Sequence, residues 1–203
     1  MLRVTVDDVM SWRPCGWDGD ETVGPYNRRY VEKLFGRRKY MTAERVLSLR
    51  CVPVVDKLWA LARPELLPRR TLQDFWLWCA GLVFKSDERR GVDVPREACD
   101  ALDAVGRFWG GVTPLDAAEE AWRAVREISR CVNVREAWDL LFSDVLSFFP
   151  INANLVEEGV SAVAYAAKMD GAKAGGAERL MLRKLRRLVE NNNVKNNPER
   201  RQK

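Results

Sequence analysis

Apolar residues recur at intervals of three and four in one segment of this chain after another, and this period is the strongest constraint on its fold. Leu72, Phe75, Trp76, Cys79 and Val83 form one such stripe. Residues at this spacing share one face of an α-helix. No segment shows the strict alternation with β-branched residues that is typical of strands. The sequence therefore predicts an all-α protein, a compact multi-helix bundle of about eight to ten helices with no significant sheet.

Residues that start helices separate these stripes. The short side chains of Thr and Asn can accept hydrogen bonds from the free N–H groups of a first turn, and Pro is tolerated in that turn. We expect the long helix capped by Thr71 to end near Lys85, before a charged turn at residues 86–91. The expected starts are Thr5, Tyr26, Thr42, Pro53, Thr71, Pro95, Thr113-Pro114, Asn133, Asn152 or Asn154, and Ala177.

The charged segment at residues 86–94 is the best candidate for an internal boundary. A chain of 203 residues is long enough for one sizeable core. We predict an N-terminal multi-helix unit (1–90), a C-terminal helical bundle (91–176) and a basic helix with a polar tail (177–203). Together they are expected to form one compact domain.

Tryptophan positions predict where the core lies. A tryptophan on an apolar helical stripe is expected to be buried, because its ring carries a large apolar area. Trp78 lies off the stripe of its helix, so it must either contact a second helix or lie open to a partner. The tryptophans on stripes are Trp59, Trp76, Trp109, Trp122 and Trp138.

The chain contains no His, which excludes several classes of enzyme. Ser-His-Asp and Cys-His catalysis both need an imidazole base, and many zinc sites need imidazole ligands. The five Cys are widely spaced without a C-x-x-C pair, so a zinc site built on Cys alone is not expected. We expect a non-enzymatic protein with no metal and no cofactor. An enzyme would have to use Asp, Glu, Tyr or Lys side chains that converge only in the fold.

Hydropathy along the chain predicts a soluble, cytoplasmic protein that does not enter a membrane. No apolar run approaches the roughly 20 residues that a bilayer-spanning helix needs. Residues 1–8 include two carboxylates and have no signal-peptide apolar region. Reduced thiols fit this compartment.

Positive charge is concentrated at the C-terminus. Residues 177–203 carry nine Lys or Arg and three Glu, a net of +6, whereas the whole chain carries +5. The last predicted helix is amphipathic, with Met181, Leu185 and Val189 on its apolar stripe. Three interpretations are open: a solvated face on a packing helix, contact with nucleic-acid phosphates, or binding to a membrane surface. The candidate binding residues are Arg179, Arg183, Lys184, Arg186 and Arg187.

A second basic group lies near residues 28–39. Tyr26, Tyr30 and Tyr40 interleave with it, an arrangement that supports stacking on bases when the rings are exposed. The alternative is that these rings face the core. The candidate binding residues of this group are Arg28, Arg29, Lys33, Arg37, Arg38 and Lys39.

Several motifs resemble a helical family of immunity proteins that is widespread in bacterial and phage genomes. The resemblance covers residues 5 to about 125 and implies an accessory, mobile-element protein that inhibits or neutralises another macromolecule. It implies no catalytic residues. The motifs are TVDDV at 5–9 with PC at 14–15, VDKLWALARPELLP at 55–68 followed by RTL at 70–72, and AAEEAW at 117–122.

The sequence therefore leads to two hypotheses about function. The first is a phage- or mobile-element-encoded inhibitor, such as an anti-CRISPR or toxin-neutralising immunity protein, which acts by steric binding to a protein or ribonucleoprotein target. The alternative is a nucleic-acid-binding accessory protein that uses residues 177–203.

Overall fold

The computed structural model describes residues 2–14, 25–129, 153–169, 171 and 175–196. Within these residues the chain forms nine helices and no strand, which confirms the all-α prediction; the only extended pairing there is an isolated bridge between Val4 and Met41. The helix expected to begin at Asn133 lies outside the described residues. The helices are α1 (Val6–Ser11), α2 (Arg28–Phe35), α3 (Ala43–Ser48), α4 (Val54–Leu61), α5 (Arg69–Arg89), α6 (Arg96–Trp109), α7 (Leu115–Ser129), α9 (Ala153–Met169) and α10 (Gly176–Asn196).

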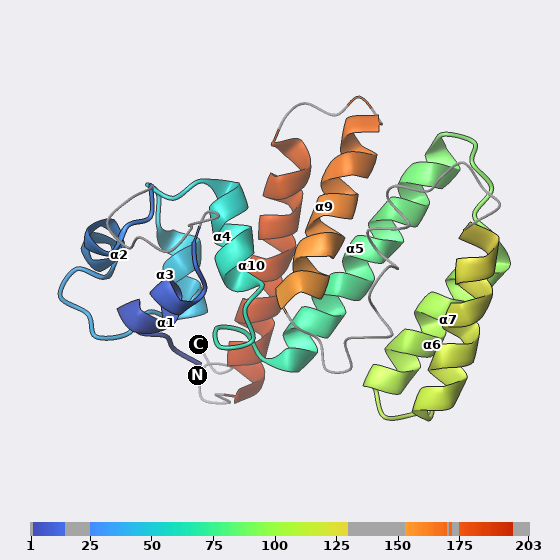
Figure 1. Cartoon of the computed structure of the whole chain (residues 1–203), viewed down its shortest axis with the longest axis horizontal. Helices are drawn as coiled ribbons and strands as arrows, with labels where there is room; N and C mark the ends of the chain where they lie inside the picture. The colour runs from blue at the N-terminus through green and yellow to red at the C-terminus, as the bar shows by residue number, and fades with distance from the viewer. Residues whose placement is uncertain (1, 15–24, 130–152, 170, 172–174, 197–203) are drawn as a thin grey trace.

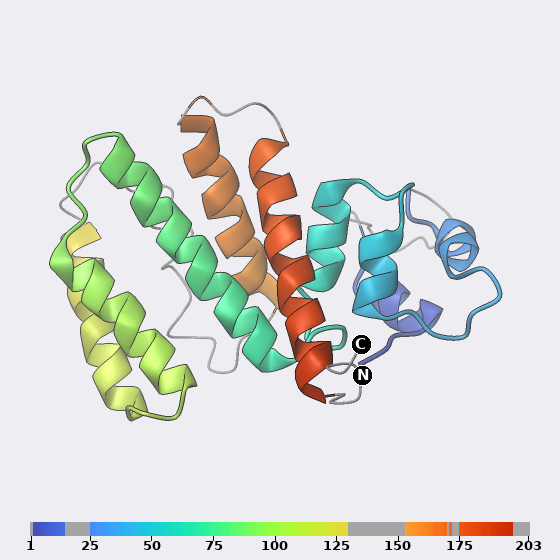
Figure 2. The same cartoon turned by 180° about the vertical axis from the view of Figure 1, so that it is seen from behind.

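The described helices form three groups along the long axis of the molecule (Figure 1). Helices α1–α3 cluster at one end, and α6 and α7 pair as a hairpin at the other, where α6 contacts α5. Between these ends, α9 packs along α5, while α10 contacts α3, α4, α5 and α9. Figure 2 shows α5 and α10 on the same face of this central bundle. The basic helix α10 is therefore a central element, packed against α3 and α4 on one side and against α5 and α9 on the other.

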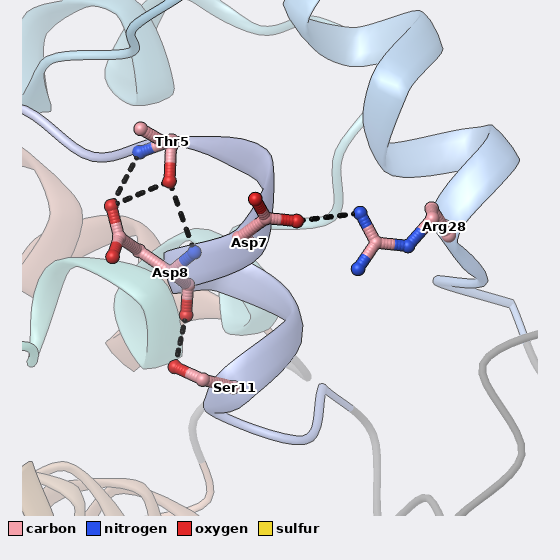
Figure 3. A network of polar contacts seen from close by, with 5 residues as sticks. All are labelled: Thr5, Asp7, Asp8, Ser11 and Arg28. Atoms are coloured by element: carbon pink, nitrogen blue, oxygen red, sulfur yellow. Dashed lines mark hydrogen bonds and ion pairs between the residues drawn. The ribbon is translucent and has the colours of Figure 1, made fainter.

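A capping box starts α1, as the sequence at Thr5 predicts. The Thr5 hydroxyl accepts a hydrogen bond from the Asp8 backbone N–H at 3.2 Å, and the Asp8 carboxylate accepts one from the Thr5 N–H at 2.7 Å (Figure 3). These reciprocal bonds satisfy two backbone donors that the first turn leaves without helical partners. The Thr5 backbone N–H and the Thr5 hydroxyl both donate to the Asp8 carboxylate, and these two bonds lower the pKa of Asp8 below its ordinary value.

Replacing Thr5 by Ala is expected to lower the free energy of unfolding by about 1 kcal/mol, the usual effect of losing an N-cap. Urea denaturation at neutral pH measures this change. Asp8→Asn should also destabilise the protein at neutral pH. Because the folded-state pKa of Asp8 is lowered, its carboxylate contributes stability that is lost as the pH falls through that pKa. The gap between wild type and Asp8→Asn should therefore close in acid.

The matched control for this prediction is Asp7→Asn, which makes the same charge change on the same helix. Asp7 forms an exposed ion pair with Arg28 at 2.7 Å and takes no part in the capping box (Figure 3). Exposed ion pairs contribute little to stability. Equal losses in the Asp7 and Asp8 variants would contradict a specific role for the cap.

The predicted start of α5 is wrong by three residues. The helix begins at Arg69 with Pro68 as its N-cap, so Thr71 lies within the first turn. Thr71 is buried, and its hydroxyl accepts a hydrogen bond from the Asn192 side chain of α10. The side chain that was expected to cap α5 instead ties this helix to α10.

The predicted end of α5 is also wrong, because residues 86–89 continue the helix instead of forming a turn. Ser86 and Asp87 are both buried. The Ser86 hydroxyl donates to the Ala166 carbonyl of α9 at 3.4 Å, and Asp87 pairs with Arg90. The segment is polar in sequence, but Ser86 finds its partner on α9 and Asp87 finds its partner in Arg90, so both polar side chains can be buried.

The tryptophan prediction is confirmed for Trp76, whose side chain is 0% exposed. Trp59 and Trp109 are half-buried, so burial was overestimated at these two positions. Trp109 lies at the C-terminal end of α6 and packs edge-on against Trp76, with ring centroids 5.5 Å apart. The Trp122 side chain and Trp138 lie outside the described residues.

Candidate functional site

Helix α10 has one buried side and one exposed basic side. Met181, Leu185 and Val189 are buried in the core, which confirms the predicted apolar stripe. Four arginines are exposed on the other side of the helix and lie within about 100° of its circumference at 3.6 residues per turn. We call this set the arginine ridge; it consists of Arg179, Arg183, Arg186 and Arg187.

The ridge presents its charges at regular intervals. Arg179, Arg183 and Arg187 follow one another every fourth residue, a rise of about 6 Å per step and about 12 Å in total. Within the described part of the chain, none of the four arginines forms an ion pair with a carboxylate. Glu190 is the exposed acidic residue on the same side of α10. The guanidinium groups of the ridge are therefore available to an external anion.

Lys184 differs from the ridge arginines, although the sequence grouped it with them. Its side chain is half-buried, and its ammonium lies 5.7 Å from the centroid of the Trp78 ring on α5. Trp78 also stacks on Phe75, with ring centroids 6.1 Å apart. Of the two alternatives for Trp78, the structure shows contact with a second helix, through a cation–π interaction.

A buried cation lies behind the ridge. Lys57 of α4 is 8% exposed, and burial lowers the pKa of its ammonium; the neighbouring Arg186 guanidinium lowers it further. Arg186 also donates a hydrogen bond of 3.5 Å to the Leu47 carbonyl of α3. Lys57 was not among the residues predicted from the sequence, because only the contact between α4 and α10 brings it near the ridge.

The core contacts of α10 bear on the membrane interpretation. An amphipathic helix binds a membrane surface by inserting its apolar side, but that side of α10 is covered by α4, α5 and α9. None of the described helices combines the length and the apolar character that a membrane span requires. The apolar side of α10 is therefore not available to a membrane surface, and the exposed side of this helix is the side that carries the arginines.

The second basic group is exposed but lies elsewhere. Arg29, Lys33, Arg37, Arg38 and Lys39 are exposed on α2 and the turn that follows it. Helix α2 packs on α1 at the end of the molecule, and α3 lies between it and α10 (Figures 1 and 2). The fold does not combine the two basic groups into one surface.

Arg28 and the tyrosines of this group have partners within the protein. Arg28 forms the ion pair with Asp7 that links α2 to α1 (Figure 3). Tyr26 and Tyr30 are half-buried and pack edge-on, with ring centroids 5.5 Å apart. The Tyr26 hydroxyl donates to the Asp56 carboxylate at 2.5 Å. The rings of Tyr26 and Tyr30 therefore pack against the protein interior, which agrees with the alternative that they face the core.

Helices α1–α4 enclose an apolar cavity of about 330 Å³ that the sequence analysis did not predict. The part of its wall that the structure describes is built from aliphatic and aromatic side chains, with Asp56 as the one acidic residue among them. Asp56 and Lys57 are the charged residues of α4, whose other residues are apolar, and this is the signal that was present in the sequence. Tyr26 and Asp56 are 30 positions apart, so their pairing has no local signature.

The described residues hold no group of three or more His, Cys, Asp and Glu side chains placed to bind a metal ion. The chain matches no protein-family model, no curated protein sequence and no solved structure. The resemblance to immunity proteins stays a prediction.

Proposed function

We propose that this protein acts by binding a macromolecule that presents negative charge, and that the arginine ridge of α10 is its contact surface. The observation that carries the proposal is the combination of four exposed arginines with a helix whose opposite side is buried in the core. The core fixes the backbone of the ridge, so less freedom is lost when the arginines meet a partner. Guanidinium groups are permanently charged and bind carboxylates and phosphates through two parallel hydrogen bonds.

Within this class, the leading proposal is a non-enzymatic inhibitor of the kind that phages and mobile elements encode, such as an anti-CRISPR or toxin-neutralising immunity protein. The resemblance to immunity proteins over residues 5 to about 125 supports it. Such a protein acts by covering part of a protein or ribonucleoprotein target. Oppositely charged surfaces accelerate the encounter and select the partner.

The second proposal is a nucleic-acid-binding accessory protein. It is favoured because no ridge arginine is ion-paired among the residues that the structure describes. Arginines clustered on one helix are the usual electrostatic footprint of phosphate contact. Binding of this kind weakens steeply with salt, because each neutralised phosphate releases counterions.

A gel-shift salt series distinguishes the two proposals. If all four ridge arginines contact phosphates of duplex DNA, the slope of log affinity against log salt should be about −3.6, which is about a 150-fold loss between about 50 and 200 mM salt. Replacing the four ridge arginines by Gln should bring the slope close to zero. The matched control replaces Arg29, Lys33, Arg37 and Arg38 by Gln, the same charge change on a distant surface, and should leave the slope unchanged.

Equal losses in the two quadruple variants would show that net charge, and not the ridge, governs binding. If the intact protein binds no nucleic acid at physiological salt, the accessory-protein proposal fails. The inhibitor proposal then predicts association with an acidic protein or ribonucleoprotein. The genes that neighbour this one would name candidates, if they encode a toxin, CRISPR-related proteins or virion proteins. Co-purification that survives in the ridge variant as well as in the control would overturn the ridge as the contact.

A further inference from the structure

The apolar cavity among α1–α4 has the size and the lining of a small-molecule site. Its volume of about 330 Å³ is about twice that of the ~150 Å³ engineered cavity that binds benzene. Ligand sites start at about 300 Å³ and are mostly apolar, with a few polar groups that orient the ligand. Trp12, Trp59 and Tyr26 supply aromatic surface to this wall.

The cavity opens to solvent on α4. Val55 lines the cavity and is also 54% exposed to solvent. A side chain with both properties lies at the opening of the cavity. Asp56 is the next residue, is half-buried and also lines the cavity. Among the lining residues that the structure describes, the one carboxylate therefore lies near the entrance, and the apolar wall extends behind it.

Asp56 is held in place but keeps capacity for another donor. The Tyr26 hydroxyl donates to Oδ2 of Asp56 at 2.5 Å, which orients the carboxylate. A carboxylate offers about four acceptor positions on its two oxygens, so one hydrogen bond leaves room for an ammonium group. Arg63 is the nearby cation on the aromatic surface, 4.4 Å from the centroid of Trp59, and it is not part of the cavity lining.

We propose that this cavity binds a small arylalkyl amine, with the ring in the apolar interior and the ammonium group on Asp56 at the mouth. Charge complementarity selects this class. An ammonium gains a charge-assisted hydrogen bond from the carboxylate and a favourable interaction with the aromatic faces, whereas an anion would be repelled by Asp56. The site is separate from the arginine ridge and does not depend on the function proposed for it.

The probe is 2-phenylethylamine, and 2-phenylethanol serves as its neutral counterpart of the same shape. Isothermal titration calorimetry on the full chain should show the amine binding about ten-fold or more tightly than the alcohol, because hydrogen bonds to charged groups are stronger. Asp56→Asn should remove that preference. Asp103→Asn, a matched change on α6 at the far end of the molecule, should keep it.

A second variant tests the cavity itself. Ala60 lines the cavity, so Ala60→Phe should fill it and abolish binding of both probes, while circular dichroism confirms the fold. Failure of wild type to bind either probe, equal affinity for both, or an unchanged preference in Asp56→Asn would overturn the proposal.

Pro14, which also lines the cavity, borders residues 15–24. Binding that appears only in Trp17→Ala would show that this segment of the chain is the occupant, which also overturns it.

Discussion

Trp76→Ala is expected to lower the free energy of unfolding by about 3–5 kcal/mol, one of the two largest effects predicted for this protein. The Trp76 side chain is fully buried in α5 and meets the edge of Trp109 from α6. Truncation removes the burial of a large ring and leaves a cavity at the contact between the central bundle and the α6–α7 hairpin. Urea denaturation followed by far-UV circular dichroism measures the change.

The matched control is Trp109→Ala, which removes the other ring of the same aromatic pair. Trp109 is only half-buried, so its replacement should cost clearly less than that of Trp76. The indole N–H of Trp76 has no hydrogen-bond partner among the described residues, so its loss adds no broken hydrogen bond to the effect. A near-neutral Trp76→Ala variant would contradict the position of the core.

Leu185→Ala is expected to cost about 2–5 kcal/mol, the range for a fully buried leucine. Leu185 is 0% exposed on the side of α10 that faces the core. The matched control is Leu180→Ala on the same helix, where the side chain is 38% exposed and the change should stay within about 0.5 kcal/mol. Equal effects at the two positions would contradict the orientation of α10.

The burial of Leu185 decides which experiment can test the basic segment. From the sequence alone, deletion of residues 177–203 would be the natural experiment, because the sequence predicts a basic helix with a polar tail there. In the fold, the deletion removes Met181 and Leu185, both fully buried. The truncated chain is expected to lose its cooperative unfolding transition, so its loss of binding would carry no information about the ridge. Surface substitutions on α10 avoid this problem.

The sequence correctly predicted which side of α10 is exposed and basic, because that property depends on one helix. Arg179, Arg183, Arg186 and Arg187 share a side of α10 because their spacing matches the helical period, which is visible in the sequence. Lys184 was grouped with these arginines, but the helical period places it at the edge of their side of α10, where its ammonium contacts the Trp78 ring of α5. Helical period gives a direction around one axis and does not say which neighbour lies in that direction.

Contacts between residues that are far apart in the chain could not be predicted from the sequence. Thr71 looked like a cap, but Asn192 of α10 contacts its hydroxyl. Ser86 and Asp87 looked like a solvated turn, but α9 buries them. Tyr26 and Asp56 looked unrelated, but they meet at the rim of the cavity. Each pairing depends on how helices pack, and no local pattern encodes that contact.

The sequence by itself determined that this chain is helical, where most of its helices begin, and which side of α10 carries charge. These properties follow from hydrogen bonds and side-chain spacing within single turns, so nearby residues decide them. Only the tertiary structure decided that α10 lies in the central bundle, that the two basic groups stay apart, and that α1–α4 enclose a cavity with a carboxylate at its mouth. The physical reason is that burial is a property of the whole fold: apolar surface is removed from water by whichever helix comes to cover it.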